Sequence, residues 1–278
     1  MRSEAGLLSL LLGVAACGEN LTVPPDRDPA SDPPVAPLEC LPNLDGKIER
    51  SELSPAIGTA ISYVVSPPDT SRSVDLTGSE GEDGTEWDFS TDYADDQSLS
   101  VTPSTLAGKW YAASFQDGAF ITPFNRAGTL ESIGLSTDGG LLLLGIASRD
   151  EAPDEGQTLL VYEPPITILK FPVEVGQSFV SAGEITNGVA LGLPYAGRDT
   201  YEVDVDAMGS VDLIQFTFDQ VFRVRTKVTV EPAVGTAVTR LQTSFYAECF
   251  AEVARATSAD GETDPDFTDA AELRRLGY

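Results

Sequence analysis

Short runs of β-branched and aromatic residues recur through most of the chain, and turn-forming residues separate them. In the clearest run, Phe222, Val224 and Val228 alternate with Arg223 and Arg225. This period of two is typical of a strand with one buried face. Runs of this kind predict strands at residues 57–65, 109–115, 128–135, 141–147, 158–163, 166–171, 201–206, 211–214, 221–230 and 238–254. They predict an all-β fold, an antiparallel β-sandwich or jelly-roll-like head.

Two short segments outside these strands predict helical turns. Near residue 50, a turn at residues 43–46 precedes a single helical turn. At the C-terminus, Thr268 or Asp269 can act as the N-cap of a short helix over residues 268–276. No stretch of the head shows the apolar stripe of a longer helix, so helices are expected only as small additions to the sheet.

The charge balance of the chain excludes several functions. The chain has 278 residues, with 44 Asp and Glu, 17 Lys and Arg and no histidine, which gives a formal net charge of −27. Without histidine, a Ser-His-Asp triad, a Cys-His pair and a His-ligated zinc site are excluded. The excess of acid repels phosphate, so no nucleic-acid partner is expected. The composition does not exclude catalysis by a pair of carboxylates, but no two acids in the sequence have a spacing that indicates such a pair.

The N-terminus has the pattern of a secretion signal. An apolar run at residues 7–16 is too short to span a bilayer and suits a signal peptide. It ends in Val14-Ala15-Ala16-Cys17, which resembles the lipobox of bacterial lipoproteins. The resemblance implies cleavage before Cys17 and acylation of that cysteine, whose acyl chains then hold the protein in a membrane. Because Gly18 follows, the outer membrane is favoured over the inner; the alternative is an ordinary signal peptide with an incidental cysteine.

The composition after the signal predicts the domain organisation. Residues 1–16 are read as the signal peptide and residues 17–39 as a lipid-anchored, proline-rich spacer with too few apolar residues to fold. Residues 40–256 form the β-sandwich domain, and residues 257–278 a polar tail with the short helix. A monomer is expected, with the membrane as its partner through the N-terminal lipid.

Two further cysteines lie at the two ends of the β-sandwich domain. Cys40 closes the spacer, and Cys249 lies in the last strand-like run. In the oxidising compartment that the N-terminus indicates, these two are expected to form a disulfide. Two buried free thiols are the alternative, and the bridge favours a single domain whose first and last segments touch.

Four motifs in the head occur in a familiar order. They are GTAISY at 58–63, WDFS at 87–90, LKFPVEVGQSF at 169–179 and FRVR at 222–225. As a set they resemble a group of uncharacterised extracellular β-sandwich domains of bacterial surface proteins. The resemblance implies a secreted β-sandwich and no particular reaction. Each motif also has a structural interpretation, since Trp87 and Phe89 suit a core and Pro172 and Gly176 suit a turn.

Residues 41–52 overlay the calcium loop of an EF-hand in part. Asn43, Asp45, Glu49 and Glu52 occupy positions at which such a loop supplies oxygen ligands. Leu41 stands where the first acid is required, and the proline-rich spacer leaves no room for the helix that precedes such a loop. The pattern fits either a weak calcium site or a plain turn followed by a helical turn. Calcium is the one cofactor that the sequence suggests.

These features together predict a lipoprotein of the bacterial cell envelope. Its head is expected to be a non-catalytic β-sandwich with a binding or structural role, toward a protein or glycan that the residues do not identify. A carboxylate-based glycan-active enzyme and a calcium-dependent adhesion module are the alternatives.

Overall fold

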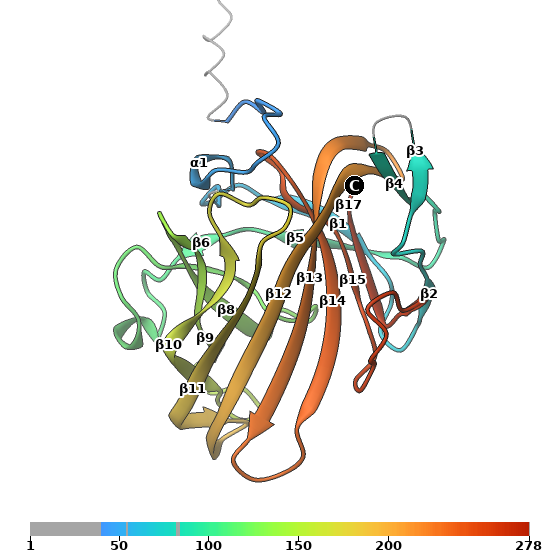
Figure 1. Ribbon diagram of the computed structural model, residues 1–278. Helices are drawn as coiled ribbons and strands as arrows, with labels where there is room; N and C mark the ends of the chain where they lie inside the picture. Colours follow the sequence, from blue (N-terminus) through green and yellow to red (C-terminus); the bar gives the residue numbers. More distant parts are fainter. Residues whose placement is uncertain (1–39, 54, 82–83, 278) are drawn as a thin grey trace, which may run out of the picture. The chain divides into compact units, whose positions relative to one another are not determined.

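The regular structure of the head is almost entirely β-strand (Figure 1). The computed structural model describes residues 40–53, 55–81 and 84–277, which belong to one unit that begins at Cys40. The signal peptide and spacer predicted over residues 1–39 lie outside the described residues.

The first half of the head holds short elements, and the second half holds the long strands. The short elements are α1 (Arg50–Leu53), β1 (Ile61–Val65), β2 (Arg72–Ser73), β3 (Ser79–Gly81), β4 (Gly84–Phe89), β5 (Gln97–Val101), β6 (Ser104–Thr105), the 3-10 turn η2 (Ala112–Ser114) and β7 (Phe120–Pro123). The following strands are β8 (Leu130–Thr137), β9 (Gly140–Ser148), β10 (Leu159–Lys170), β11 (Ser178–Ala190), β12 (Leu193–Leu213), β13 (Thr217–Pro232), β14 (Val238–Ala247), β15 (Ala251–Thr257), β16 (Asp269–Ala270) and β17 (Glu272–Leu276).

One 15-stranded sheet contains most of these strands. Its order is β5-β1-β17-β15-β14-β13-β12-β11-β10-β9-β8-β7-β6, so β7 to β15 form a meander in which each strand pairs with the next. The described pairs are antiparallel, except that β4 adds to the far end of β12 in parallel. This all-antiparallel meander confirms the all-β prediction and favours the sandwich-like form of it.

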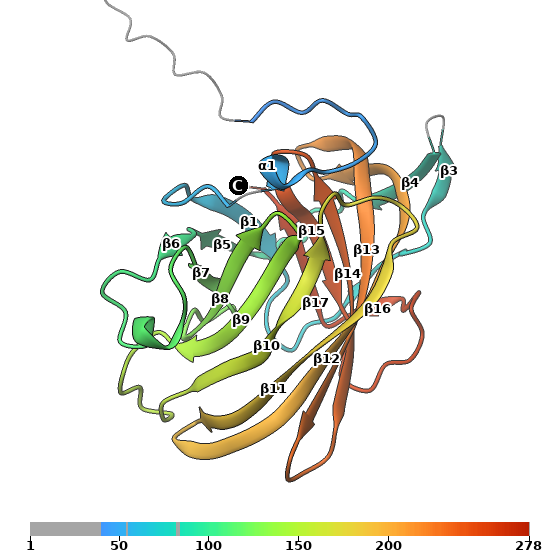
Figure 2. The same ribbon diagram turned by 60° about the vertical axis from the view of Figure 1, so that its left-hand side comes forward.

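The two edge strands of this path, β5 and β6, are neighbours in the chain. β5 ends at Val101 and β6 begins at Ser104, so only Thr102 and Pro103 separate them. A linker this short spans at most about 10 Å, and the two ends of the sheet must therefore lie close together. The sheet curls accordingly, and Figure 2 shows β8, β9 and β10 on the left of the sheet and β13, β14 and β15 on the right, with α1 at one end. The curled sheet has an inner and an outer face.

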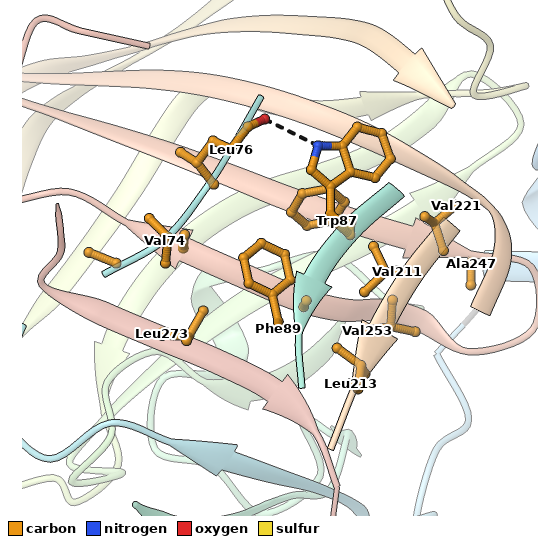
Figure 3. Close-up of a cluster of buried hydrophobic side chains, with 14 of the residues drawn as sticks. Val74, Leu76, Trp87, Phe89, Val211, Leu213, Val221, Ala247, Val253 and Leu273 are labelled. Atoms are coloured by element: carbon orange, nitrogen blue, oxygen red, sulfur yellow. Dashed lines mark hydrogen bonds between the residues drawn. The ribbon is translucent and has the colours of Figure 1, made fainter. Parts of the chain in front are cut away.

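The outer face of β13, β14 and β15 carries the largest apolar core, which we call the outer core (Figure 3). Trp87 and Phe89 of β4 pack there against Phe245 of β14, with ring centroids 5.0 and 5.3 Å apart. The indole Nε1 of Trp87 donates to the Leu76 carbonyl at 3.2 Å, so the buried ring leaves no donor unpaired. This confirms that the two aromatic residues of β4 are core residues.

The two predicted helical turns have different outcomes. The one near residue 50 is confirmed, because α1 is a single turn there. The C-terminal helix is wrong, because residues 272–276 form β17, which lies between β1 and β15. Leu273 and Arg275 point to the outer face and Arg274 to the inner face, so the segment has the period of a strand. The last residues thus fill a gap inside the sheet, and the polar tail predicted over 257–278 belongs to the same compact unit as the strands through residue 277.

Candidate binding site on the inner face of the sheet

Cys40 and Cys249 form the disulfide that their positions predicted, with Cα atoms 5.6 Å apart. Glu248, next to it, accepts hydrogen bonds from the backbone N–H groups of Asn43 at 2.6 Å and Leu44 at 3.0 Å. These contacts fasten the first described segment to the turn between β14 and β15. The predicted lipidation site, Cys17, lies outside the described residues.

The predicted calcium loop closes on itself through hydrogen bonds. The side-chain amide of Asn43 donates to Glu52 Oε1 at 2.7 Å, and the backbone N–H of Glu49 donates to Glu52 Oε2 at 2.8 Å. Asp45 accepts the backbone N–H of Lys47, whose ammonium group pairs with Glu49 at 2.7 Å. Within the described ranges, no three His, Cys, Asp or Glu side chains gather as a metal site. The side-chain oxygens of this loop accept hydrogen bonds from within the loop, and α1 follows it as a single turn; the weak calcium site stays a prediction.

The inner face of β14, β15 and β17 is polar, in contrast to the outer core behind it. In the antiparallel register, Ser244 lies opposite Arg255, and Arg255 lies opposite Arg274. Glu252 lies opposite Tyr246 and Glu272 lies opposite Thr257, on the same inner face. Because alternate residues of a strand face opposite sides, these strands present apolar residues to the outer core and charged residues to the interior.

Five charged side chains on this face form one group, which we call the charged cluster. Glu272 Oε1 accepts from Arg255 at 3.1 Å and from Arg274 at 3.4 Å. Arg126, in the loop between β7 and β8, reaches across to Glu272 Oε2 at 3.4 Å. Glu252 lies 3.6 Å from Arg255. One carboxylate is thus shared among three guanidinium groups, two of which come from strands and one from a loop.

The arginines of the charged cluster have more donors than the cluster has acceptors. The buried Nε atoms of Arg126, Arg255 and Arg274 have no hydrogen-bond partner, and neither has Nη1 of Arg126. A buried donor left without a partner costs about 1–3 kcal/mol, so folded proteins rarely keep several of them in one place. Three guanidinium groups also outnumber two carboxylates, which leaves the cluster with a net charge of +1.

The surroundings of Arg255 and Arg274 shift their pKa values in opposite directions. Burial and the neighbouring Arg255 guanidinium lower the pKa of Arg274. Burial also disfavours the charge on Arg255, but Glu252 and Glu272 outweigh it and raise the pKa of Arg255. Of these two cations, Arg274 is the one that the carboxylates compensate less.

Tyrosine and serine hydroxyls complete the polar side of the interior. Tyr63 of β1 donates its hydroxyl to the Glu252 carbonyl at 3.0 Å, and the Arg274 guanidinium lies 5.6 Å from the centre of its ring. Ser244 donates to Glu252 at 2.9 Å. Burial raises the pKa of both Tyr63 and Tyr246, so both phenols stay neutral donors at physiological pH.

The opposite side of the interior is apolar. A cluster from β9, β10, β11 and β12, which we call the apolar wall, consists of Leu143, Ile146, Tyr162, Ile166 and Ile185, with Tyr201 packed against it. Leu130, four residues after Arg126, packs against the same wall. The loop that carries Arg126 therefore links the apolar wall to the charged cluster.

Two buried acids elsewhere in the described residues, Asp199 and Glu131, have different partners. Asp199 accepts the Tyr162 hydroxyl at 2.6 Å, and burial raises the pKa of Asp199. Glu131 accepts from Lys109 at 2.7 Å and from Tyr111. Within this part of the chain, the two acids sit in different side-chain clusters, one against the apolar wall and one beneath the 3-10 turn.

Sequence reasoning missed the charged cluster because its members are far apart in the chain. One signal was present: Glu252 and Arg255 lie in a run that is otherwise rich in alanine and valine, where solvated charges have no evident place. Comparisons of the chain with protein-family models, curated proteins and solved structures find no match. No helix among the described residues is long and apolar enough to cross a membrane. What the head does must be inferred from this geometry.

Proposed function

We propose that this protein is a lipoprotein of the bacterial cell envelope whose head is a non-catalytic ligand-binding module. The observation that carries the binding role is the charged cluster, a set of buried guanidinium donors without partners on the inner face of a curled sheet. A purely structural interior favours apolar residues or fully paired charges. A ligand-binding interior instead contains a few hydrogen-bond donors that pair with the ligand and are unpaired without it.

The proposed location rests on features of the N-terminus and of the head. The lipobox resemblance at Cys17 supplies the anchor, and the Cys40–Cys249 disulfide suits an oxidising compartment outside the cytosol. Gly18 after the cysteine favours the outer membrane. The resemblance of the head motifs to extracellular β-sandwich domains supports the same location.

The anchor is tested by metabolic labelling with palmitate. The full chain should incorporate label and partition with membranes, and Cys17→Ala should do neither. The Cys40→Ala/Cys249→Ala double variant is the matched control, because it removes cysteines from the head and should stay labelled. Label that persists in Cys17→Ala would contradict the lipoprotein assignment.

The binding role is tested by native mass spectrometry of the chain purified from its own envelope. A bound small molecule that is released by denaturation, at one copy per chain, supports a binding module. A chain that carries no molecule, and whose thermal stability no small-molecule library raises, would contradict it.

A further inference from the structure

Resting on the binding role proposed above, we propose that the charged cluster binds the carboxylate of a singly charged organic acid whose apolar part lies along the apolar wall. The carboxylate would accept from the free Nε and Nη1 atoms of Arg126 and from the free Nε of Arg274 and Arg255. These are the described donors of the interior that lack any acceptor of their own.

The net charge of the cluster selects the charge of the ligand. Three arginines and two glutamates leave a charge of +1, which one carboxylate neutralises. A phosphate dianion would exceed this charge and would meet Glu252 and Glu272 at close range. Planar guanidinium groups also match the two oxygens of a carboxylate. The site therefore suits a monocarboxylate better than a phosphate ester.

Parts of the cluster are open to solvent, although its free donor atoms are buried. Arg255 and Glu272 retain 20% and 25% of their side-chain exposure, although they lie on the inner face. Arg274 retains 10% and is the least exposed of the three arginines. A carboxylate would thus approach beside Arg255 and Glu272, the more exposed members.

The apolar wall lies next to the same loop and would take the apolar part of the ligand. Arg126 contacts Glu272 on the charged side, and Leu130 of β8 packs on the apolar wall with Leu143 and Ile146. An acid with a short hydrocarbon chain would bury apolar surface there, which adds affinity roughly in proportion to the area buried. Acetate, which has no such chain, should bind much more weakly than hexanoate.

Isothermal calorimetry on the oxidised full chain in non-ionic detergent tests this ligand class. The titrants are hexanoate, acetate, 1-hexanol and inorganic phosphate, each corrected by a titration into detergent alone. We expect hexanoate to bind with a stoichiometry of one, and at least about tenfold more tightly than the other three. Equal binding of acetate or phosphate, tighter binding of hexanol, or no heat from hexanoate would each overturn the proposal.

A variant pair tests the site itself. Arg126→Gln removes the arginine with two free donors, and because it lies in a loop with one long contact to Glu272, the fold should tolerate it. Loss of a charge-assisted hydrogen bond should weaken hexanoate binding about 10- to 100-fold. Arg240→Gln removes the same charge from an exposed pair with Asp260 and should leave the affinity within about twofold. Equal affinities in the two variants would overturn the assignment.

The melting curves of both variants show whether Arg126→Gln is folded. If it is not, the wild-type comparison of hexanoate with hexanol still decides the proposal, since only the carboxylate distinguishes them. Failure of the monocarboxylate proposal is distinct from failure of the proposed binding function. A molecule without a carboxylate, found on the chain purified from its envelope, would overturn the monocarboxylate and leave the binding module standing.

Discussion

The Cys40–Cys249 disulfide joins residues 209 positions apart, and its removal should change stability more than any single contact in the head. In the chain-entropy model, a cross-link that closes a loop of this length removes about 18 cal/mol/K from the unfolded chain. At 25 °C this corresponds to about 5 kcal/mol of stability. The Cys40→Ser/Cys249→Ser variant should therefore unfold at a much lower denaturant concentration.

The folded state should change little in this variant, because other contacts hold the same segment. Ile48 is fully buried and exchanges two backbone hydrogen bonds with Val173, at 3.0 and 2.8 Å. Cys249 also donates its backbone N–H to the Glu52 carbonyl at 2.8 Å. The loss should thus arise mainly in the unfolded state, and the figure of about 5 kcal/mol is an upper value.

Urea unfolding followed by tryptophan fluorescence measures the effect, because Trp87 lies in the outer core. The matched control is Cys17→Ser, which keeps the disulfide and should unfold as the wild-type head does. Adding reductant to the wild type should reproduce the double variant. A loss below about 1 kcal/mol, with an unchanged dependence on urea, would refute the argument from loop closure.

Three further substitutions test the packing and the buried charges. Trp87→Ala should cost about 3–5 kcal/mol in urea unfolding through the cavity it leaves, and a cost under 1 kcal/mol would contradict the outer core. Asp96→Asn should cost about 3–5 kcal/mol, because it leaves the buried Arg275 without its carboxylate; an unchanged urea midpoint would show that this pair is not needed. Burial raises the pKa of Asp199, so its ionisation removes stability as pH rises above the unfolded value of about 4. Asp199→Asn should therefore melt higher than the wild type at pH 7, with a difference that fades below about pH 4; an equal difference at both pH values would contradict this.

Strand prediction succeeded where alternation was long and failed where apolar residues clustered without a period. Residues 221–230 alternate cleanly and lie within β13. Residues 109–115 were predicted as a strand, but they form turns and η2, from which Trp110, Tyr111 and Phe115 pack onto β7, β8 and β9. A short run in which most residues are apolar fits a strand and a turn equally, and its neighbours in space decide between them.

Residues that favour turns also occur where a strand is only interrupted. The sequence predicts separate strands at 158–163 and 166–171, yet Pro164 and Pro165 between them lie inside β10. The pairing of β10 with β9 shifts register between Val161 and Ile166, so the prolines sit where the ladder is interrupted. Asn187-Gly188 likewise lies inside β11, beside a register shift after Ile185. A bulge and a turn use the same residues, and strand pairing separates them.

The charged cluster was beyond prediction from one sequence for a different reason. Arg126 and Glu272 are 146 positions apart, and their contact depends on the curl of the whole sheet. Arg274 and Arg275 lie in the segment that was predicted to be a helix, whereas the strand that it forms places one arginine on each face. Arg275 then pairs with Asp96 on the outer face, and Arg274 joins the cluster. The number and the sign of the charges follow from the composition, and only the fold determines where each one lies.

The net charge of −27 has a different meaning once the position of the cluster is known. The excess acid repels any anion at a distance, and the repulsion grows with the charge that the anion carries. At physiological ionic strength this field is screened within about 8 Å of the surface. On the proposal above, a monocarboxylate with an apolar body would meet a low barrier and then gain both a net positive site and apolar contact, while a nucleic acid or a polyphosphate would be repelled at every charge. The acidic composition and the net positive cluster would then together favour small, singly charged ligands, which is a selectivity that a role in solubility alone does not require.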